Sequence, residues 1–94
     1  MSLIADPRTP RASITIECRL FARYAELLGR DQLTLTLPET ATVGEAIATL
    51  RSRLEQGDLL PAAPLAAVNL EHSQLDRQLR DGDELALLPP LAGG

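Results

Sequence analysis

The sequence predicts a single α+β domain in which one main helix packs on a mixed sheet of four or five strands. With 94 residues, the chain is long enough for one hydrophobic core and too short for two. Several segments alternate apolar and polar residues, with the period of two that is typical of half-buried strands. One longer segment repeats its apolar residues every three or four positions, as a helix that covers one face of a sheet does.

The N-terminal part predicts an extension, a strand and a short helix. Residues 1–12 contain two prolines and no hydrophobic periodicity, so we expect a flexible extension. Residues 13–21 (SITIECRLF) alternate, which predicts the first strand. Cys18 falls on its apolar side, and we interpret it as a core residue rather than a sulfur relay. In residues 22–29 the period changes to three and four, which predicts a short helix that ends at Gly29.

A second strand and the main helix follow. Residues 32–38 (QLTLTLP) alternate leucine with polar residues and end in proline, which predicts the second strand. Residues 42–56 (TVGEAIATLRSRLEQ) carry one apolar stripe and predict the main helix. Thr42 and Glu45 have the spacing of a capping box at its start. Gly57 is well placed to end the helix.

The C-terminal part predicts three further strands. Residues 65–70 (LAAVNL) indicate one strand, and residues 72–79 hold a short edge strand around Gln74. We expect residues 80–83 (RDGD) to form a tight turn, with Asp81 bonded to its own backbone, rather than a cation site. Residues 84–88 (ELALL) predict the last strand. We expect this strand to be central and parallel to the first, because both are strongly apolar.

Composition excludes several classes of function. Thirteen acidic residues against nine basic ones, all arginine, give a net charge of −4, and aromatic residues are 2% of the chain, which argues against nucleic-acid binding. No apolar run approaches the roughly 20 residues that span a membrane. A single histidine and a single cysteine do not make a zinc site, and no nucleotide-binding motif is present. We therefore expect a cytoplasmic protein that is not an enzyme by itself.

The last six residues offer little to a folded core. They are Pro89, Pro90, Leu91, Ala92, Gly93 and Gly94. Consecutive prolines keep a segment stiff and extended, and glycine leaves room for an enzyme channel to close around the backbone. A carboxylate reacts with a nucleophile only after activation, typically as an acyl-adenylate, and a second protein would have to supply the ATP site. The tail therefore predicts a carrier of an acyl group, against the alternative of an interaction domain whose Gly-Gly is incidental.

Two motifs resemble the MoaD-type sulfur carriers, the small subunits of molybdopterin synthase within the MoaD/ThiS family. One is LFARY-x-ELLG in residues 20–29, and the other is GDE-x4-PP-x2-GG in residues 82–94. The segment TVGEAIATL in residues 42–50 is similar to the same family. The likeness covers about residues 13–94.

The resemblance implies a β-grasp, ubiquitin-like domain over residues 13–88 and an extended reactive tail over residues 89–94. It further implies that an E1-like adenylyltransferase adenylates Gly94, and that a sulfurtransferase or cysteine desulfurase supplies the sulfur of a thiocarboxylate. The tail would then enter the large catalytic subunit of a heterotetramer and donate sulfur to cyclic pyranopterin monophosphate. No metal and no bound cofactor are implied, apart from the covalent thiocarboxylate.

The partner surface and the final acceptor are further expectations. We expect Phe21, Leu87 and Leu88 to form an apolar surface that contacts a partner. Related carriers could serve another product, such as the thiamine thiazole, a thiolated tRNA base or cysteine. A protein modifier conjugated through Gly94 is a rival of a different class, although the absence of lysine weighs against one that forms chains on itself.

Overall fold

The computed structural model describes residues 13–90, which form a five-stranded sheet with two α-helices and one short 3-10 helix. The elements in chain order are β1 (Ser13–Leu20), α1 (Ala22–Leu28), β2 (Gln32–Pro38), α2 (Val43–Arg53), η1 (Gly57–Leu59), β3 (Leu65–Val68), β4 (Glu71–Ser73) and β5 (Glu84–Leu88). The predicted order of elements is confirmed. Residues 1–12, for which we expected a flexible extension, lie outside the described residues.

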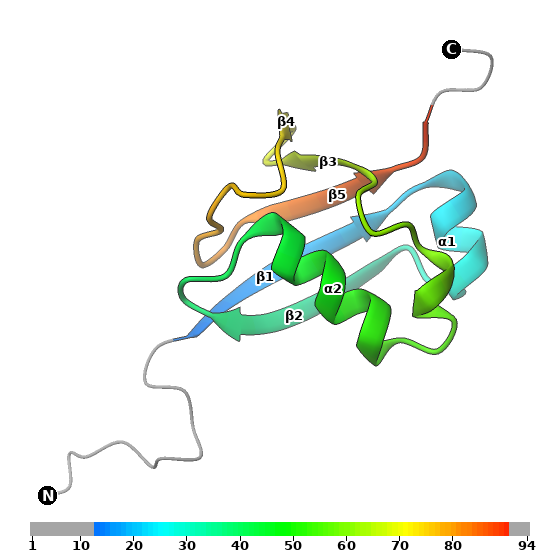
Figure 1. The fold of residues 1–94 in the computed structure, drawn as a ribbon, viewed down its shortest axis with the longest axis horizontal. Helices are drawn as coiled ribbons and strands as arrows, with labels where there is room; N and C mark the ends of the chain where they lie inside the picture. The colour runs from blue at the N-terminus through cyan, green and yellow to red at the C-terminus, as the bar shows by residue number, and fades with distance from the viewer. Residues whose placement is uncertain (1–12, 91–94) are drawn as a thin grey trace, which may run out of the picture.

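The strands lie in the order β2-β1-β5-β3-β4, and α2 lies across one face of the sheet (Figure 1). β1 and β5 are adjacent and parallel, whereas the β1–β2, β3–β5 and β3–β4 pairs are antiparallel. The predicted central position of the last strand is therefore confirmed. A strand that is paired on both sides is held along its whole length, so β5 is a rigid base for the residues that follow it.

One aliphatic core fills the space between α2 and the sheet. β1 alternates exposed and buried side chains, as its sequence predicts, and Cys18 is fully buried on the helix-facing side. The apolar stripe of α2 packs against this face through Val43, Ala46, Ile47 and Leu50. The period of two in the strand and the period near 3.6 in the helix thus supply the two surfaces of one core.

The predicted capping box of α2 is present. The Thr42 hydroxyl accepts a hydrogen bond from the Glu45 backbone N–H (3.2 Å), and the Glu45 carboxylate accepts one from the Thr42 backbone N–H (2.9 Å). The short helix α1 ends, as predicted, at Gly29, whose φ of 71° is left-handed. Both signals are local, and they are readable from the sequence because the partners lie within one turn.

The end of α2 differs from the prediction. The helix ends at Arg53 rather than at residue 56, because Leu54 adopts an extended conformation. Gly57 instead begins η1 and lies directly against the helix, where an added Cβ would approach the Leu50 carbonyl oxygen to 2.5 Å. Residue 57 must be glycine because a side chain would collide with the helix backbone, and not because the helix ends there.

The β3–β4 connection is tighter than expected. β3 ends at Val68 rather than residue 70, because Asn69 and Leu70 adopt left-handed conformations with φ of 51° and 73°. These two residues turn the chain into β4, which lies slightly earlier than the predicted edge strand. His72 is exposed on this edge strand opposite Ala67.

Candidate functional site

The candidate site is the point where the chain leaves β5. β5 is paired with β1 on one side and with β3 on the other, and Pro89 and Pro90 directly follow it at one edge of the molecule (Figure 1). We call these two prolines the neck. Of the predicted reactive tail, Leu91, Ala92, Gly93 and Gly94 lie outside the described residues.

An apolar patch lies beside the neck on the sheet face opposite α2. Leu88 is half-buried and pairs directly with Leu65, which is 48% exposed. Leu20 pairs with Leu87, and each is followed by one further extended residue, Phe21 and Leu88. Because successive strand residues point to opposite faces, Phe21 and Leu88 lie on the same face. The Phe21 side chain is 40% exposed. We call Phe21, Leu65 and Leu88 the sheet-face patch.

Leu87 does not belong to this patch, contrary to the prediction. Its side chain is fully buried in the core, together with Leu85, on the side that α2 covers. Successive strand residues point to opposite faces, so Leu87 and Leu88 cannot both face a partner. Leu65 takes its place in the patch. The sequence signal was available, because Leu65 is out of phase with Ala66 and Val68 on the buried face.

The turn before β5 fixes the start of that strand. Gly82 has a φ of 86°, and residues 80–83 form the predicted turn. However, the Asp81 carboxylate accepts its hydrogen bond from the Thr15 backbone N–H of β1 (2.7 Å), and not from its own turn. The turn is thereby tied to β1, which sets the register of the central parallel pair.

Among residues 13–90, Asp83 is the one carboxylate that is buried, with 9% of its surface exposed. It accepts hydrogen bonds from the Asn69 side-chain amide (2.9 Å) and from the Arg80 backbone N–H (2.8 Å). The side-chain oxygen Oδ1 of Asn69 in turn accepts a hydrogen bond from the Glu84 backbone N–H (2.9 Å). Both oxygens of the Asp83 carboxylate therefore accept hydrogen bonds from within the domain, and we interpret the residue as structural.

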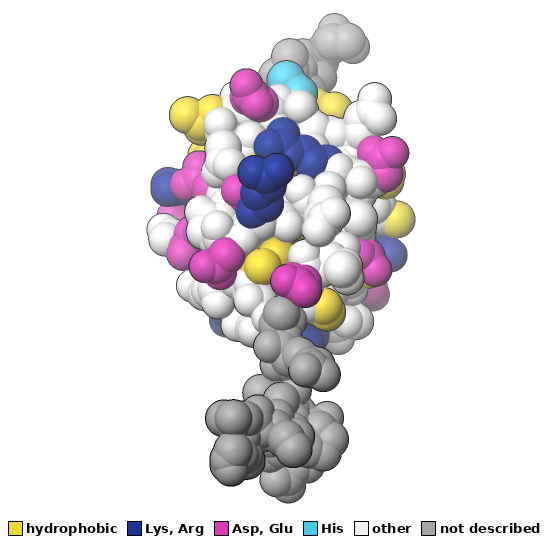
Figure 2. Space-filling view, turned by 90° about the vertical axis from the view of Figure 1, so that its left-hand side faces the viewer, with side chains coloured by type: hydrophobic (Ala, Val, Ile, Leu, Met, Phe, Trp, Pro, Cys, Tyr) yellow, Lys and Arg dark blue, Asp and Glu magenta, His cyan; other side chains and the backbone are white. Residues whose placement is uncertain are grey.

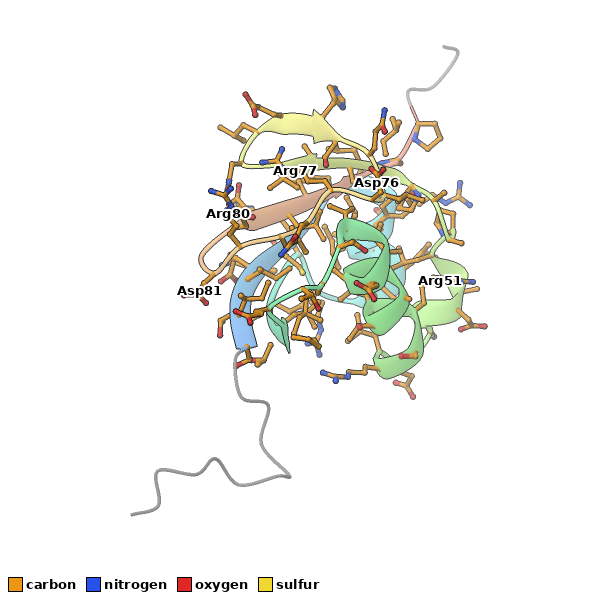
Figure 3. The ribbon with its side chains drawn as sticks, turned by 60° about the vertical axis from the view of Figure 1, so that its left-hand side comes forward. Arg51, Asp76, Arg77, Arg80 and Asp81 are labelled. Carbon is orange, nitrogen blue, oxygen red and sulfur yellow. The ribbon has the colours of Figure 1, made fainter. Side chains whose placement is uncertain are left out.

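A cluster of basic groups lies at the end of the sheet away from the neck. Basic side chains gather on the end of the molecule shown in Figure 2, with acidic groups around them. Arg77 and Arg80 belong to this end, with Asp81 close by in the chain (Figure 3). On the open face, Arg19 and Glu84 form an exposed ion pair at 3.5 Å. Such a pair contributes little to stability in water.

The described residues offer no assembled metal centre. Within residues 13–90 there is no group of three or more histidine, cysteine, aspartate or glutamate side chains that could hold a metal ion. Burial, and to a smaller extent the charge of Glu17, raises the pKa of the Cys18 thiol to about 12, so it is a poor nucleophile at neutral pH. No helix in the described part of the chain is long and apolar enough to cross a membrane.

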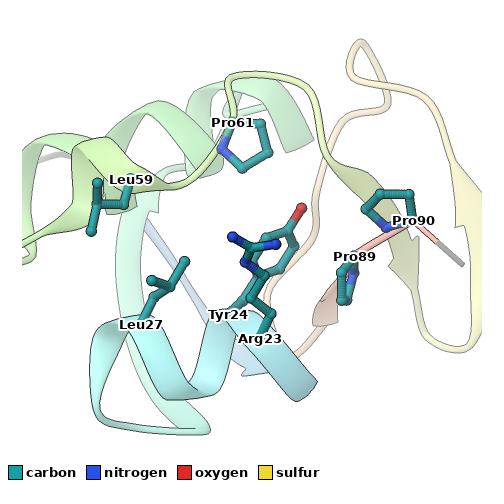
Figure 4. A pocket seen from close by; sticks show the side chains of 7 residues that line it. All are labelled: Arg23, Tyr24, Leu27, Leu59, Pro61, Pro89 and Pro90. Atoms are coloured by element: carbon teal, nitrogen blue, oxygen red, sulfur yellow. The ribbon is translucent and has the colours of Figure 1, made fainter. Parts of the chain in front are cut away.

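A groove lies on the other side of the neck. It has a volume of about 730 Å³ and is lined by Arg23, Tyr24, Leu27, Leu59, Pro61, Pro89 and Pro90 (Figure 4). Its walls come from α1, from the end of η1 together with Pro61, and from the neck. No sequence signal could reveal it, because these segments are far apart in the chain. The neck therefore lies between the sheet-face patch and this groove.

Known proteins are similar to this chain in sequence. The molybdopterin synthase sulfur carrier subunit of Escherichia coli is 35% identical over 85 residues, which cover 84% of this chain and 99% of the relative. Small archaeal modifier protein 1 of Haloferax volcanii is 34% identical over 88 residues, covering 84% of this chain and all of the relative.

Solved structures agree on the fold. A molybdopterin converting factor subunit 1 from Pyrococcus furiosus superposes with a TM-score of 0.74 at 29% identity, covering 83% of this chain and 99% of that one. A ubiquitin of Caldiarchaeum subterraneum shares the fold alone, with a TM-score of 0.61 at 18% identity. The predicted β-grasp fold is confirmed. The model of the ThiS family matches residues 18–94, and the chain belongs to this family of sulfur-carrier and ubiquitin-like proteins.

Proposed function

We propose that this chain is the sulfur carrier of a molybdopterin synthase and that Gly94 is its reactive residue. The observation that carries the proposal is the position of the neck, which directly follows the central strand and adjoins an exposed apolar patch. A central strand holds the base of the tail in place, and an exposed patch beside it is suited to a partner that takes the tail in. The 35% identity to the sulfur carrier subunit of Escherichia coli supports this function.

The chemistry begins with activation of the Gly94 carboxylate by a partner. A carboxylate oxygen attacks the α-phosphorus of ATP on an E1-like adenylyltransferase, and pyrophosphate leaves. Persulfide sulfur from a sulfurtransferase or cysteine desulfurase then attacks the acyl carbon, and AMP leaves. In the resulting acyl disulfide a thiol attacks the sulfur that belongs to the donor cysteine and forms a disulfide with it, so that the thiocarboxylate on Gly94 is released. The carrier's own role is to present the carboxyl group, as a group carrier does.

The second half of the proposed cycle is delivery. The tail enters the active site of a large catalytic subunit, and the sheet-face patch contacts that subunit. The thiocarboxylate sulfur attacks a side-chain carbon of cyclic pyranopterin monophosphate there and displaces an oxygen from that carbon, which leaves as a phosphate oxygen or as water. Hydrolysis of the resulting thioester leaves the sulfur on the pterin and returns the Gly94 carboxylate. One carrier delivers one sulfur, so a product with two sulfurs needs two deliveries, which suits a heterotetramer with two carriers.

Intact-mass spectrometry tests the proposal. The chain, with a free C-terminus, is co-expressed with the adenylating enzyme and the sulfur donor of its own host. We expect a mass increase equal to the replacement of one oxygen by sulfur, located at Gly94. A variant without Gly94 should keep its unfolding midpoint and lose the modification. An unmodified chain beside an adenylating enzyme that is active on another carrier would contradict the proposal.

One observation favours a second candidate function. The 34% identity to small archaeal modifier protein 1 makes conjugation to other proteins the main alternative. In that case the activated Gly94 carboxyl group would form an isopeptide bond with a lysine amine of a target. An immunoblot of host extract would then show higher-mass species that disappear in the variant without Gly94. A sulfur carrier gives the mass change of the thiocarboxylate and no such species.

A further inference from the structure

The groove beside the neck combines apolar walls with two polar groups. Leu27, Leu59 and Pro61 line one part of it, and the two prolines of the neck line another. Leu59 is 52% exposed, so a large part of this apolar surface is open to solvent. A concave apolar surface with a few polar groups is the usual form of a binding site.

The Tyr24 hydroxyl lies in the groove. Only 4% of the Tyr24 surface is exposed, and its ring is part of the core. Its hydroxyl end is directed toward Pro61 in the groove (Figure 4). This hydroxyl makes no hydrogen bond to another of the residues 13–90. No fully buried side-chain nitrogen or oxygen in residues 13–90 lacks a partner, so this hydroxyl is reached by solvent and is available to a ligand.

Arg23 supplies a positive charge at the same place. Its side chain is exposed, lines the groove and lies beside Tyr24 in Figure 4. Within the described residues it forms no ion pair, whereas Arg19 on the open face is paired with Glu84. A guanidinium and a hydroxyl in one apolar groove together favour a carboxylate that is flanked by an apolar side chain.

We propose that this groove is a second docking site for the enzyme that adenylates Gly94, and that it receives an acidic residue of that enzyme together with a neighbouring apolar side chain. The inference rests on the proposed function. The groove shares the neck with the tail, so an enzyme that encloses the tail comes to lie against it. The sheet-face patch and the groove then hold the neck from two sides.

The physical reason for a second contact lies in the tail itself. Two glycines and one alanine have little side-chain surface, so the tail alone offers little binding energy. The reacting carboxylate must nevertheless be held in line with the α-phosphorus of ATP. Binding energy from parts remote from the reacting group is what enzymes use for such positioning. A charged contact close to the neck would also fix the orientation of the carrier.

The test measures the dissociation constant of each variant from the adenylating enzyme of the same host by isothermal titration calorimetry. We expect Arg23→Glu to weaken binding by about tenfold, because it places like charges in the contact. Arg23→Lys keeps the charge and should lose less. Arg77→Glu makes the same change in net charge at the opposite end of the sheet and should bind as the unsubstituted chain does (Figure 3).

Two further variants examine the other components of the groove. Leu59→Glu introduces a charge into the apolar wall, and because Leu59 is half exposed we expect weaker binding with an unchanged unfolding midpoint. Tyr24→Phe removes only the hydroxyl group and should weaken binding by a smaller factor. The rate of thiocarboxylate formation at low carrier concentration should fall in the same order as the affinities.

The outcomes separate this inference from the function on which it rests. If the unsubstituted chain is thiocarboxylated and Arg23→Glu binds the adenylating enzyme equally well, the groove proposal is wrong and the carrier function stands. The groove proposal would also be wrong if Arg23→Glu weakened binding to the large subunit but not to the adenylating enzyme. If the unsubstituted chain is never thiocarboxylated, both fail.

Two other occupants of the groove would likewise overturn the proposal. Self-association that Arg23→Glu abolishes, measured by sedimentation, would show that a second copy fills the groove. A shift of the Tyr24 ring resonances when residues 91–94 are removed from the free chain would show that the chain's own tail fills it.

Discussion

Cys18 illustrates how burial sets the chemistry of a single residue. The thiol is fully buried on the helix-facing side of β1, and this burial, with a smaller contribution from Glu17, raises its pKa from 9.0 to about 12. The thiolate is therefore almost absent at neutral pH. The residue is part of the core, as the alternation of β1 predicts, and it takes no part in the proposed sulfur chemistry.

The raised pKa of Cys18 makes stability depend on alkaline pH. Between 9.0 and about 12 the folded state holds a proton that the unfolded state has lost, so the free energy of unfolding should fall as the pH rises through this range. Below 9.0 the contribution is fully present. Urea unfolding from pH 8 to pH 11 measures the slope. A Cys18→Ala variant should show a shallower decline, and identical slopes in the two proteins would contradict the prediction.

Asp83 is a second residue whose role the structure defines. Asp83→Ala should lower the free energy of unfolding by about 1–3 kcal/mol, because it removes the acceptor of the Asn69 amide and the Arg80 backbone N–H. Asp76→Ala removes an exposed carboxylate from the same connection and is the matched control, with little change expected. Chemical denaturation of both variants provides the measurement. Equal stabilities would show that the Asp83 hydrogen bonds are not needed.

At the scale of elements, the start of α2 rests on a reciprocal pair of hydrogen bonds. Thr42→Ala should destabilise the protein by about 1 kcal/mol, because the Glu45 backbone N–H loses its acceptor. Glu45→Ala removes the other half of the capping box. Thermal or urea unfolding of the two single variants and the double variant gives the coupling. Strictly additive losses would contradict a cooperative capping box.

The sequence predicted the start of α2 better than the ends of α2 and β3. The beginning of α2 was predicted correctly, because both capping partners lie within one turn. Its end was misplaced by three residues, because the early termination at Leu54 is followed by η1 packing against the helix, as the close approach at Gly57 shows. The left-handed turn at Asn69 and Leu70 was missed for a related reason, since Asn69 is held there by Asp83 and Glu84.

At the scale of the whole molecule, the two leucines before the neck have opposite roles. Leu87→Asp should cost about 4 kcal/mol or more and prevent folding, because it places a carboxylate in the core. Leu88→Asp should leave the domain folded and weaken binding to the large subunit, since Leu88 is on the open face beside Leu65. Circular dichroism and titration calorimetry distinguish the two effects. Unaltered binding by a folded Leu88→Asp protein would remove the sheet-face patch from the proposed interface.

Assembly of the whole molecule decides which surfaces flank the neck. The groove unites α1, η1 and the neck, which lie more than 25 residues apart in sequence, and only the crossing of the chain over the sheet brings them together. Leu65 meets Leu88 for the same reason, through the pairing of β3 with β5. The sequence analysis predicted the tail, the neck, and Phe21 and Leu88 of the sheet-face patch. It predicted neither the pairing of Leu65 with Leu88 nor the groove, because both depend on contacts between distant segments.

The sequence by itself determined the α+β class, the order of the elements, the aliphatic core, the capping box and the family, because these depend on periodicity and on short motifs. The β-grasp arrangement followed from the resemblance. Only the tertiary structure decided that Leu87 lies in the core while Leu88 lies half-buried on the open face, that Asp81 bonds to β1, and that Arg23 and Tyr24 share a groove with the neck. These features depend on strand register and on contacts between distant segments, which the order of residues along the chain does not specify.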